Sequence, residues 1–191
     1  MTSQLAGKTL IGKTIAILVA NGFDENQMTE IQRSLIKVKA TIKTIAPENG
    51  VVNGWQGAGW GHYFPIDGQI GETLGSDFDM LVLPGGERAV AKLKGNLHTK
   101  RIISHFIDAE KPVAAIGAGV GLLALANGIK GRDVSAPAEL QAELTNAGAA
   151  VSEDALHIDG TLLTSNGDDL NIWVEAAMNL FDVVEQEQVA A

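Results

Sequence analysis

Apolar and polar positions along the chain switch repeatedly between continuous apolar runs and stripes at helical spacing. Residues 13–20 (KTIAILVA) form an apolar, β-branched run, which is typical of a strand buried on both faces of a parallel sheet. The next segment predicts a helix opened by Asp24 or Asn26. Its apolar stripe consists of Met28, Ile31, Leu35 and Val38.

The same alternation continues to the end of the chain. Strands are predicted at 40–47, where Pro47 ends the alternation, and at 78–86 and 112–117. Helices are predicted at 87–94, 98–109, 120–128, 138–147 and 170–181, with Gly128 and Gly148 closing the third and fourth. Residues 155–166 indicate a strand hairpin that turns at Asp159-Gly160. Strands alternating with helices predict a three-layer, flavodoxin-like α/β sandwich with a mostly parallel central sheet.

The length of 191 residues, with 46% hydrophobic content, suits one domain with one core. We place this domain at residues 13–181, after a flexible lead-in at 1–12 and before a frayed tail at 182–191. Residues 49–69 are rich in glycine and aromatic residues, which indicates a long excursion containing a short hairpin. There is no internal repeat.

Charge and cysteine content exclude several classes of function. The 23 acidic residues against 14 basic ones give a net charge of −9, which disfavours binding to nucleic acid or anionic membranes. The lack of an 18-residue apolar run and of a signal-peptide segment leads us to expect a cytoplasmic protein. The absence of cysteine excludes disulfides, zinc sites built on thiolates and cysteine nucleophiles.

Two glycine-rich stretches resemble cofactor-binding motifs without their context. Residues 7–14 (GKTLIGKT) match the spacing of a phosphate-binding loop, but Lys13-Thr14 opens a strand rather than a helix. The turn after residues 112–117 resembles a dinucleotide-binding turn, yet Leu122 stands where a third glycine belongs, and Asp133 is too near to be the ribose-binding acid. We therefore expect no bound cofactor.

A third interpretation of that turn is a nucleophile elbow, a strand-to-helix turn that presents one side chain at the sheet edge. Five stretches, in their order and at their distances, resemble the ThiJ/PfpI family of the class I glutamine amidotransferase-like superfamily. They are IAILVANGFDENQM, FDMLVLPGG, KPVAAIGAG, GIKGRDVSAPAEL and DGTLLTSNGDDL. The resemblance spans residues 13–181. It implies a flavodoxin-like fold and, in most members, a cysteine nucleophile beside a histidine at the elbow.

This chain departs from the family at those reactive positions. Gly117 stands where the cysteine would be, and Ala118 stands where the histidine would be. Gly119 follows them in the elbow. A glycine relieves the backbone strain of the turn, because it adopts positive φ at little cost. The resemblance also implies a carboxylate after the first strand, which Asp24 matches with Glu25 beside it, although Asp24 fits a helix cap equally well.

The chain also departs from the family near the end of the domain, and it resembles one subgroup of the family more than the others. Asn166 and Gly167 replace an arginine and a proline of many relatives, so the resemblance does not extend to an anion-binding arginine. The chain is similar to the C-terminal domain of large-subunit catalases, which likewise lacks the cysteine. No haem-binding body is present in the sequence, so that resemblance implies no peroxide chemistry.

Histidines and loop aromatics complete the candidate residues. The histidines are His62, His98, His105 and His157; none pairs with another at a metal-ligand spacing, so we expect surface or packing roles and no metal site. Trp55, Trp60, Tyr63 and Phe64 either pin the 49–69 segment to the core or form a contact between subunits, and we favour a homodimer or higher oligomer.

Two functions follow from this sequence. The first is a ThiJ/PfpI-like binding, structural or regulatory module without the family's cysteine chemistry, with an unknown small molecule as a potential ligand. The second is a hydrolase, amidase or glyoxalase-like enzyme whose acid-base site has moved to Asp24, Glu25 and a distant histidine, because adjacent carboxylates can separate their pKa values into an acid and a base.

Overall fold

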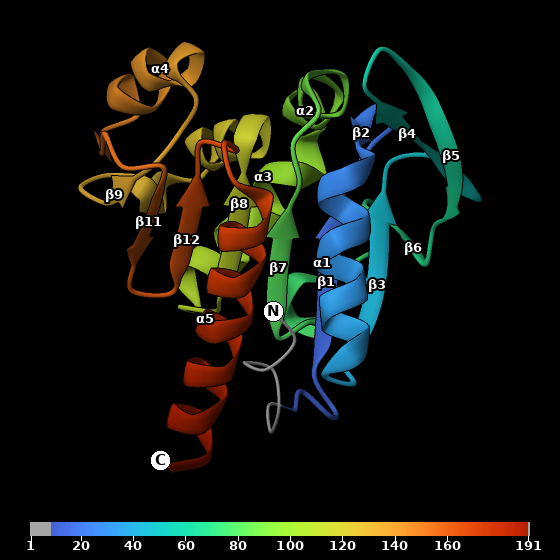
Figure 1. The fold of residues 1–191 in the computed structure, drawn as a ribbon, viewed down its shortest axis with the longest axis horizontal. Coiled ribbons are helices and arrows are strands. Elements are labelled where there is room, and N and C mark those ends of the chain that lie inside the picture. Colours follow the sequence, from blue (N-terminus) through green and yellow to red (C-terminus); the bar gives the residue numbers. More distant parts are fainter. Residues whose placement is uncertain (1–8, 191) are drawn as a thin grey trace.

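A central sheet of seven strands, with helices on both faces, organises the computed structural model, which describes residues 9–190 (Figure 1). The strand order is β11-β12-β8-β7-β1-β3-β6, and every pairing is parallel except that of β11 with β12. The strands are β1 (Thr14–Leu18), β3 (Thr41–Ala46), β6 (Gly68–Gln69), β7 (Met80–Leu83), β8 (Val113–Ile116), β11 (Leu156–Asp159) and β12 (Leu162–Ser165). The predicted three-layer α/β fold is confirmed.

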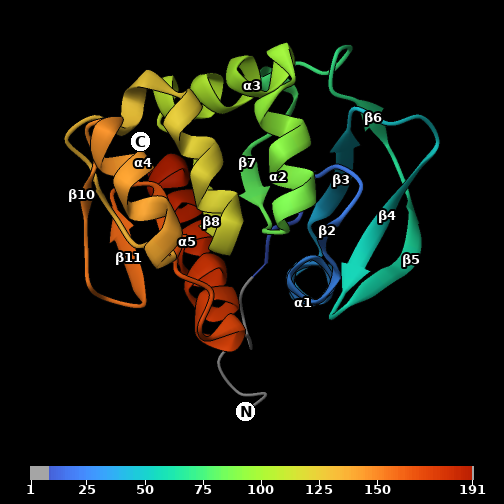
Figure 2. The same cartoon turned by 90° about the horizontal axis from the view of Figure 1, so that it is seen from above.

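The middle of this sheet is apolar because both of its faces are covered. Strands β7, β8 and β12 are buried at every position, and β1 is buried after its first residue. Figure 2 shows α1 (Glu25–Lys37) and α5 (Leu170–Ala190) on one face, and α2 (Glu87–Lys94) and α3 (Leu97–Asp108) on the other. The carboxyl ends of the parallel strands lie at one edge of the sheet, so the loops that follow β1, β7 and β8 begin there.

Two smaller sheets lie beside the main one. In the first, β2 (Phe23–Asp24) pairs with β4 (Val51–Gln56), which forms an antiparallel hairpin with β5 (Gly59–Pro65). We call β4 and β5 the aromatic hairpin; it is the hairpin predicted within residues 49–69. The second pairs β9 (Asp133–Val134) with β10 (Ala150–Val151). The predicted hairpin at 155–166 is present as β11 and β12, with Gly160 in a left-handed conformation at its turn.

One predicted helix has a different form. Residues 120–128 were expected to be an α-helix closed by Gly128, but the structure has a 3-10 helix, η2 (Gly117–Leu125), with Gly128 in a separate turn, η3 (Asn127–Ile129). Glycines lower the α-helical propensity of this segment. Gly128 is required for packing instead, because a β-carbon there would lie 1.9 Å from Ile107 Cγ2 on α3.

The ends of the domain also differ from expectation. Helix α5 continues to Ala190 instead of stopping at residue 181, in keeping with its run of residues without glycine or proline. At the other end, residues 1–8 of the predicted lead-in lie outside the described residues, while Leu10 is buried and its N–H donates to Val38 O at 2.7 Å.

Residues 138–147 form a short 3-10 turn, η4 (Ala138–Leu140), and α4 (Gln141–Asn146).

A short 3-10 turn, η1 (Gly75–Asp77), precedes β7. Within residues 9–190, no helix has the length and apolar content needed to cross a membrane.

Candidate functional site

The turn after β8 has the backbone geometry of an elbow. Gly117 has φ of +56°, in the left-handed region, as expected for a glycine that relieves strain at this position. Gly119 lies so close to the loop after β7 that a β-carbon there would be 2.3 Å from Leu83 O and 2.6 Å from Pro84 O. The turn is therefore held in shape by close backbone packing between two neighbouring parallel strands.

The side chain that faces the elbow is Gln27, from the first turn of α1. A β-carbon built on Gly117 would lie 3.4 Å from Gln27 Nε2. The other end of this amide is fixed, because Gln27 Oε1 accepts a hydrogen bond from Gly85 N at 2.6 Å. Gln27 was not among the predicted site residues, although its spacing of three from Asp24 puts the two on the same side of the helix.

Asp24, the predicted family carboxylate, acts as the N-cap of α1. Its Oδ1 accepts from Gln27 N at 3.0 Å, and its own N–H donates to Gly85 O at 2.9 Å. The capping interpretation of Asp24 is thus confirmed. The residue that lies against Gly117 carries a neutral amide rather than a carboxylate.

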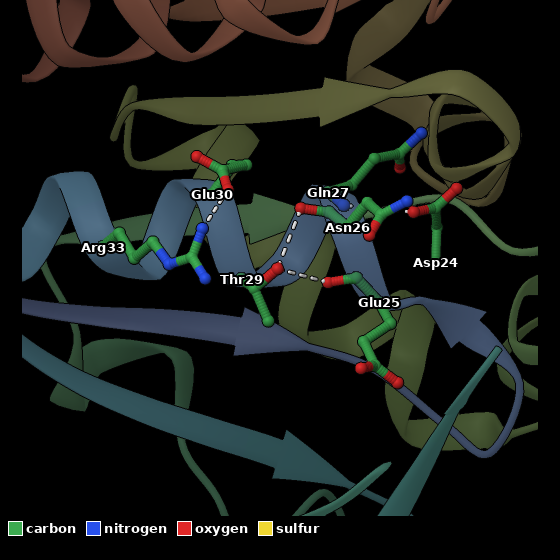
Figure 3. A network of polar contacts seen from close by, with 7 residues as sticks. All are labelled: Asp24, Glu25, Asn26, Gln27, Thr29, Glu30 and Arg33. Carbon is green, nitrogen blue, oxygen red and sulfur yellow. Dashed lines mark hydrogen bonds and ion pairs between the residues drawn. The ribbon is translucent and has the colours of Figure 1, made fainter. Parts of the chain in front are cut away.

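Glu25 points away from Asp24 and Gln27, toward the aromatic hairpin (Figure 3). Its side chain is 6% exposed, and it receives two hydrogen bonds from one residue. His62 N donates to Glu25 Oε2 at 2.8 Å, and His62 Nδ1 lies 2.5 Å from Oε1. Two glycines make room for the carboxylate: a β-carbon on Gly54 would lie 2.6 Å from Oε2, and one on Gly61 only 1.8 Å.

The burial of Glu25 acts to raise the pKa of its carboxyl, but the side-chain and backbone hydrogen bonds from His62, together with their charge attraction, outweigh it. The net effect is a pKa below the ordinary value of a glutamate. An ionised carboxylate only accepts hydrogen bonds, so the Nδ1 of His62 carries the shared proton and Nε2 is left free on a ring that is 77% exposed. The structure therefore brings together one predicted acid and one predicted histidine.

The remaining histidines stay apart. His98 and His105 both lie on α3, where His105 packs edge-on against Phe106, and His157 lies on β11. Among the side chains that the structure describes, no three metal-ligating groups come together in a way that could hold an ion.

The four loop aromatics divide into two groups. Phe64 packs edge-on against buried Phe23 at 5.4 Å, and Trp55 is half-buried, so both pin the aromatic hairpin to the domain. Trp60 and Tyr63 are 55% and 70% exposed. The structure thus supports the pinning role for Phe64 and Trp55, while a contact between subunits through Trp60 and Tyr63 stays a prediction.

The other predicted positions have structural explanations. Thr14 opens β1, as expected for a motif that lacks the setting of a phosphate-binding loop, and Leu122 is fully buried. Asn166 makes reciprocal hydrogen bonds with Asp168: Asn166 Nδ2 donates to Asp168 Oδ2 at 2.8 Å, and Asp168 N donates to Asn166 Oδ1 at 3.0 Å. This local turn is formed at the positions where the family resemblance led us to look for an arginine and a proline.

Comparisons with known proteins agree with the fold. The sequence profile of the DJ-1/PfpI family matches residues 13–180. Protein/nucleic acid deglycase 2 of Escherichia coli is 31% identical over 173 residues, covering 89% of this chain and 98% of its own. General stress protein 18 of Bacillus subtilis is 29% identical, covering 83% of this chain and 91% of its own.

Among solved structures, a two-domain protein from Anabaena variabilis with DJ-1/ThiJ/PfpI-like and ferritin-like domains superposes with a TM-score of 0.80 at 27% identity. The match covers 87% of this chain and 47% of that one, so the chain spans about half the length of this neighbour.

Proposed function

The chain belongs to the DJ-1/PfpI family, and from that premise we propose that it is a binding, structural or regulatory module that has lost the family's cysteine chemistry. One observation carries the proposal. The elbow position bears no side chain, and the side chain nearest to where one would begin is the amide of Gln27.

The chemistry of that neighbourhood supports the same conclusion. Acyl transfer and carbonyl chemistry at an elbow need a nucleophile and a base within hydrogen-bond reach of it. Gly117, Ala118 and Gly119 contribute only hydrogen and methyl groups, and an amide neither takes up nor releases a proton near neutral pH. The activity named for the deglycase relative therefore does not transfer to this elbow.

We further propose that the module is cytoplasmic and self-associates through the aromatic hairpin. Strand β5 is the outer strand of its small sheet and carries exposed Trp60 and Tyr63, which offer an apolar contact next to an unpaired strand edge. Sedimentation of the wild type and of a Trp60→Ser/Tyr63→Ser variant tests this. We expect the variant to shift to monomer, and a wild type that sediments as a monomer at all concentrations would refute it.

Turnover assays test the lost chemistry. We expect purified protein to show no hydrolysis of peptide or amide substrates and no consumption of methylglyoxal above the buffer rate. A Gln27→Ala variant provides the comparison, because it changes the elbow neighbourhood without touching Glu25. Turnover by the wild type that disappears in Gln27→Ala would show that the elbow is catalytic after all.

A second candidate function is a hydrolase- or glyoxalase-like enzyme with a relocated acid-base site, and the Glu25–His62 pair favours it. A buried carboxylate bonded to Nδ1 orients the ring and leaves Nε2 as the base, which is the arrangement of general-base histidines. The same assays distinguish the two functions. Activity that survives Gln27→Ala and His157→Asn but is lost in His62→Asn would establish this second function.

A further inference from the structure

We propose that Arg88, which packs against the Trp55 and Trp60 indoles, is a binding site for a small organic carboxylate with a flat apolar body. This site lies on α2 beside the aromatic hairpin, and it does not depend on whether the elbow is catalytic. The proposal rests on the state of the Arg88 guanidinium, on the fixed geometry of the residues around it and on the exposure of Trp60.

Arg88 differs from the other arginines in having no hydrogen-bonding partner among the residues that the structure describes. Arg33 pairs with Glu30, Arg101 donates to two main-chain carbonyls, and Arg132 donates to two others. Arg88 makes no hydrogen bond or ion pair with any residue in the described part of the chain, and its guanidinium lies over the Trp55 and Trp60 rings. Its planar fork of N–H donors therefore remains available to an anion.

The guanidinium is held in place. Its Cζ lies 4.5 Å from the centroid of the Trp55 ring and 6.0 Å from that of Trp60. The arginine stem crosses Gly22, where a β-carbon would lie 2.6 Å from Arg88 Cβ, so only a glycine at position 22 allows this path. A cation–π contact attracts the whole cation to the ring face and does not use the N–H groups in conventional hydrogen bonds, so these donors stay available.

The indoles are fixed as well. Trp55 Nε1 donates to Gly57 O at 2.9 Å, and the two indole rings meet edge to face at 5.4 Å. Each partner of the guanidinium is thus oriented before any ligand arrives, which reduces the entropy lost on binding.

The choice of ligand follows from these groups. A carboxylate matches the guanidinium fork with two parallel hydrogen bonds, and the exposed face of Trp60 offers an apolar surface to a flat organic body beside it. Lys92, one turn along α2, adds a second positive charge, although it lies 3.5 Å from Glu48 Oε1 and is partly neutralised. In a chain of net charge −9, a pre-oriented and unpaired arginine is a local exception to the overall field.

Isothermal titration calorimetry with benzoate tests the proposal, with benzamide as the neutral analogue and inorganic phosphate as an anion without an apolar body. We expect saturable benzoate binding that weakens roughly ten- to a hundredfold in Arg88→Gln, the range for loss of charged hydrogen bonds. Arg88→Lys, which keeps the charge and the stem, should also weaken binding, because it lacks the planar fork. Arg33→Gln removes the same charge from α1 and should leave binding within twofold of wild type.

Several outcomes would overturn the site. These are an absence of saturable heat with benzoate, equal weakening in Arg33→Gln and Arg88→Gln, and benzamide or phosphate binding as tightly as benzoate. Dissociation of an oligomer by Arg88→Gln at constant protein concentration would also overturn it, because a partner chain would then occupy the guanidinium. None of these results bears on turnover at the elbow, so this site and the loss of cysteine chemistry fail independently. The proposed self-association would bury the same Trp60, so the site belongs to the protomer in which Trp60 is exposed.

Discussion

The contact between Glu25 and the aromatic hairpin makes a sharp prediction about glycine 61. In the Gly61→Ala variant, the new β-carbon would lie 1.8 Å from Glu25 Oε2 and 2.9 Å from its Cδ, so the carboxylate has to leave its position. Leaving it breaks both hydrogen bonds from His62. Gly61 does not have positive φ, so the expected cost arises from this contact and not from backbone strain.

The magnitude follows from those two bonds. Hydrogen bonds to a charged group each stabilise a protein by about 1.5–3 kcal/mol. Because His62 is exposed, a displaced carboxylate reaches water and recovers part of this energy, so we expect Gly61→Ala to lower the free energy of unfolding by about 2–4 kcal/mol. Gly59 lies on the same strand and its β-carbon would meet nothing within 4 Å, so Gly59→Ala should be neutral or stabilising by up to about 1 kcal/mol.

Urea denaturation of four variants completes the test: Gly61→Ala, Gly59→Ala, Glu25→Ala and the Glu25→Ala/Gly61→Ala double variant. If the clash is with the carboxylate, Gly61→Ala should cost less than about 0.5 kcal/mol once Glu25 is alanine. The reasoning would be refuted by a Gly61→Ala cost no larger than that of Gly59→Ala, or by a cost that is unchanged in the double variant.

Two further predictions concern acid stability and the elbow. The folded-state pKa of Glu25 is lowered, so the stability it contributes is present above the ordinary glutamate pKa and is lost as the pH falls through the lower folded-state value. Glu25→Gln should flatten the acid limb of the stability profile measured by urea denaturation, and an unchanged limb would argue against the His62 pairing. Gly117→Ala should cost about 1–2 kcal/mol for left-handed backbone strain, whereas Gly119→Ala, whose β-carbon would meet Leu83 O at 2.3 Å, should cost considerably more. Equal losses by thermal denaturation would contradict this account of the turn.

Much of the fold was predictable because a strand buried on both faces of the sheet appears in the sequence as a continuous apolar run. Apolar runs such as 13–20 and 112–117 became β1 and β8, and the turn at Asp159-Gly160 formed as expected. The form of residues 120–128 was not predictable from periodicity, because an apolar run with glycines fits an α-helix and a 3-10 helix equally. Gly128 was misassigned as a cap because its close approach to Ile107 is a tertiary contact.

The site was predictable only in part. Asp24 was placed correctly at the start of α1, and the positive φ of Gly117 was expected. Helical spacing shows which residues share a side of α1. Gln27 lies three residues after Asp24 and shares its side, and Glu25 lies three residues before buried Met28 and shares the side of Met28. The pairing of Glu25 with His62 joins residues 37 apart in the chain, so no local pattern could have revealed it.

The measurement that most directly tests the loss of cysteine chemistry is kcat/KM for amide hydrolysis and methylglyoxal consumption, compared between the wild type and Gly117→Ala at equal folded concentration. We expect rates that match the buffer blank for both proteins, because neither has a reactive group at the turn after β8. A wild-type rate well above the blank that Gly117→Ala abolishes would contradict it.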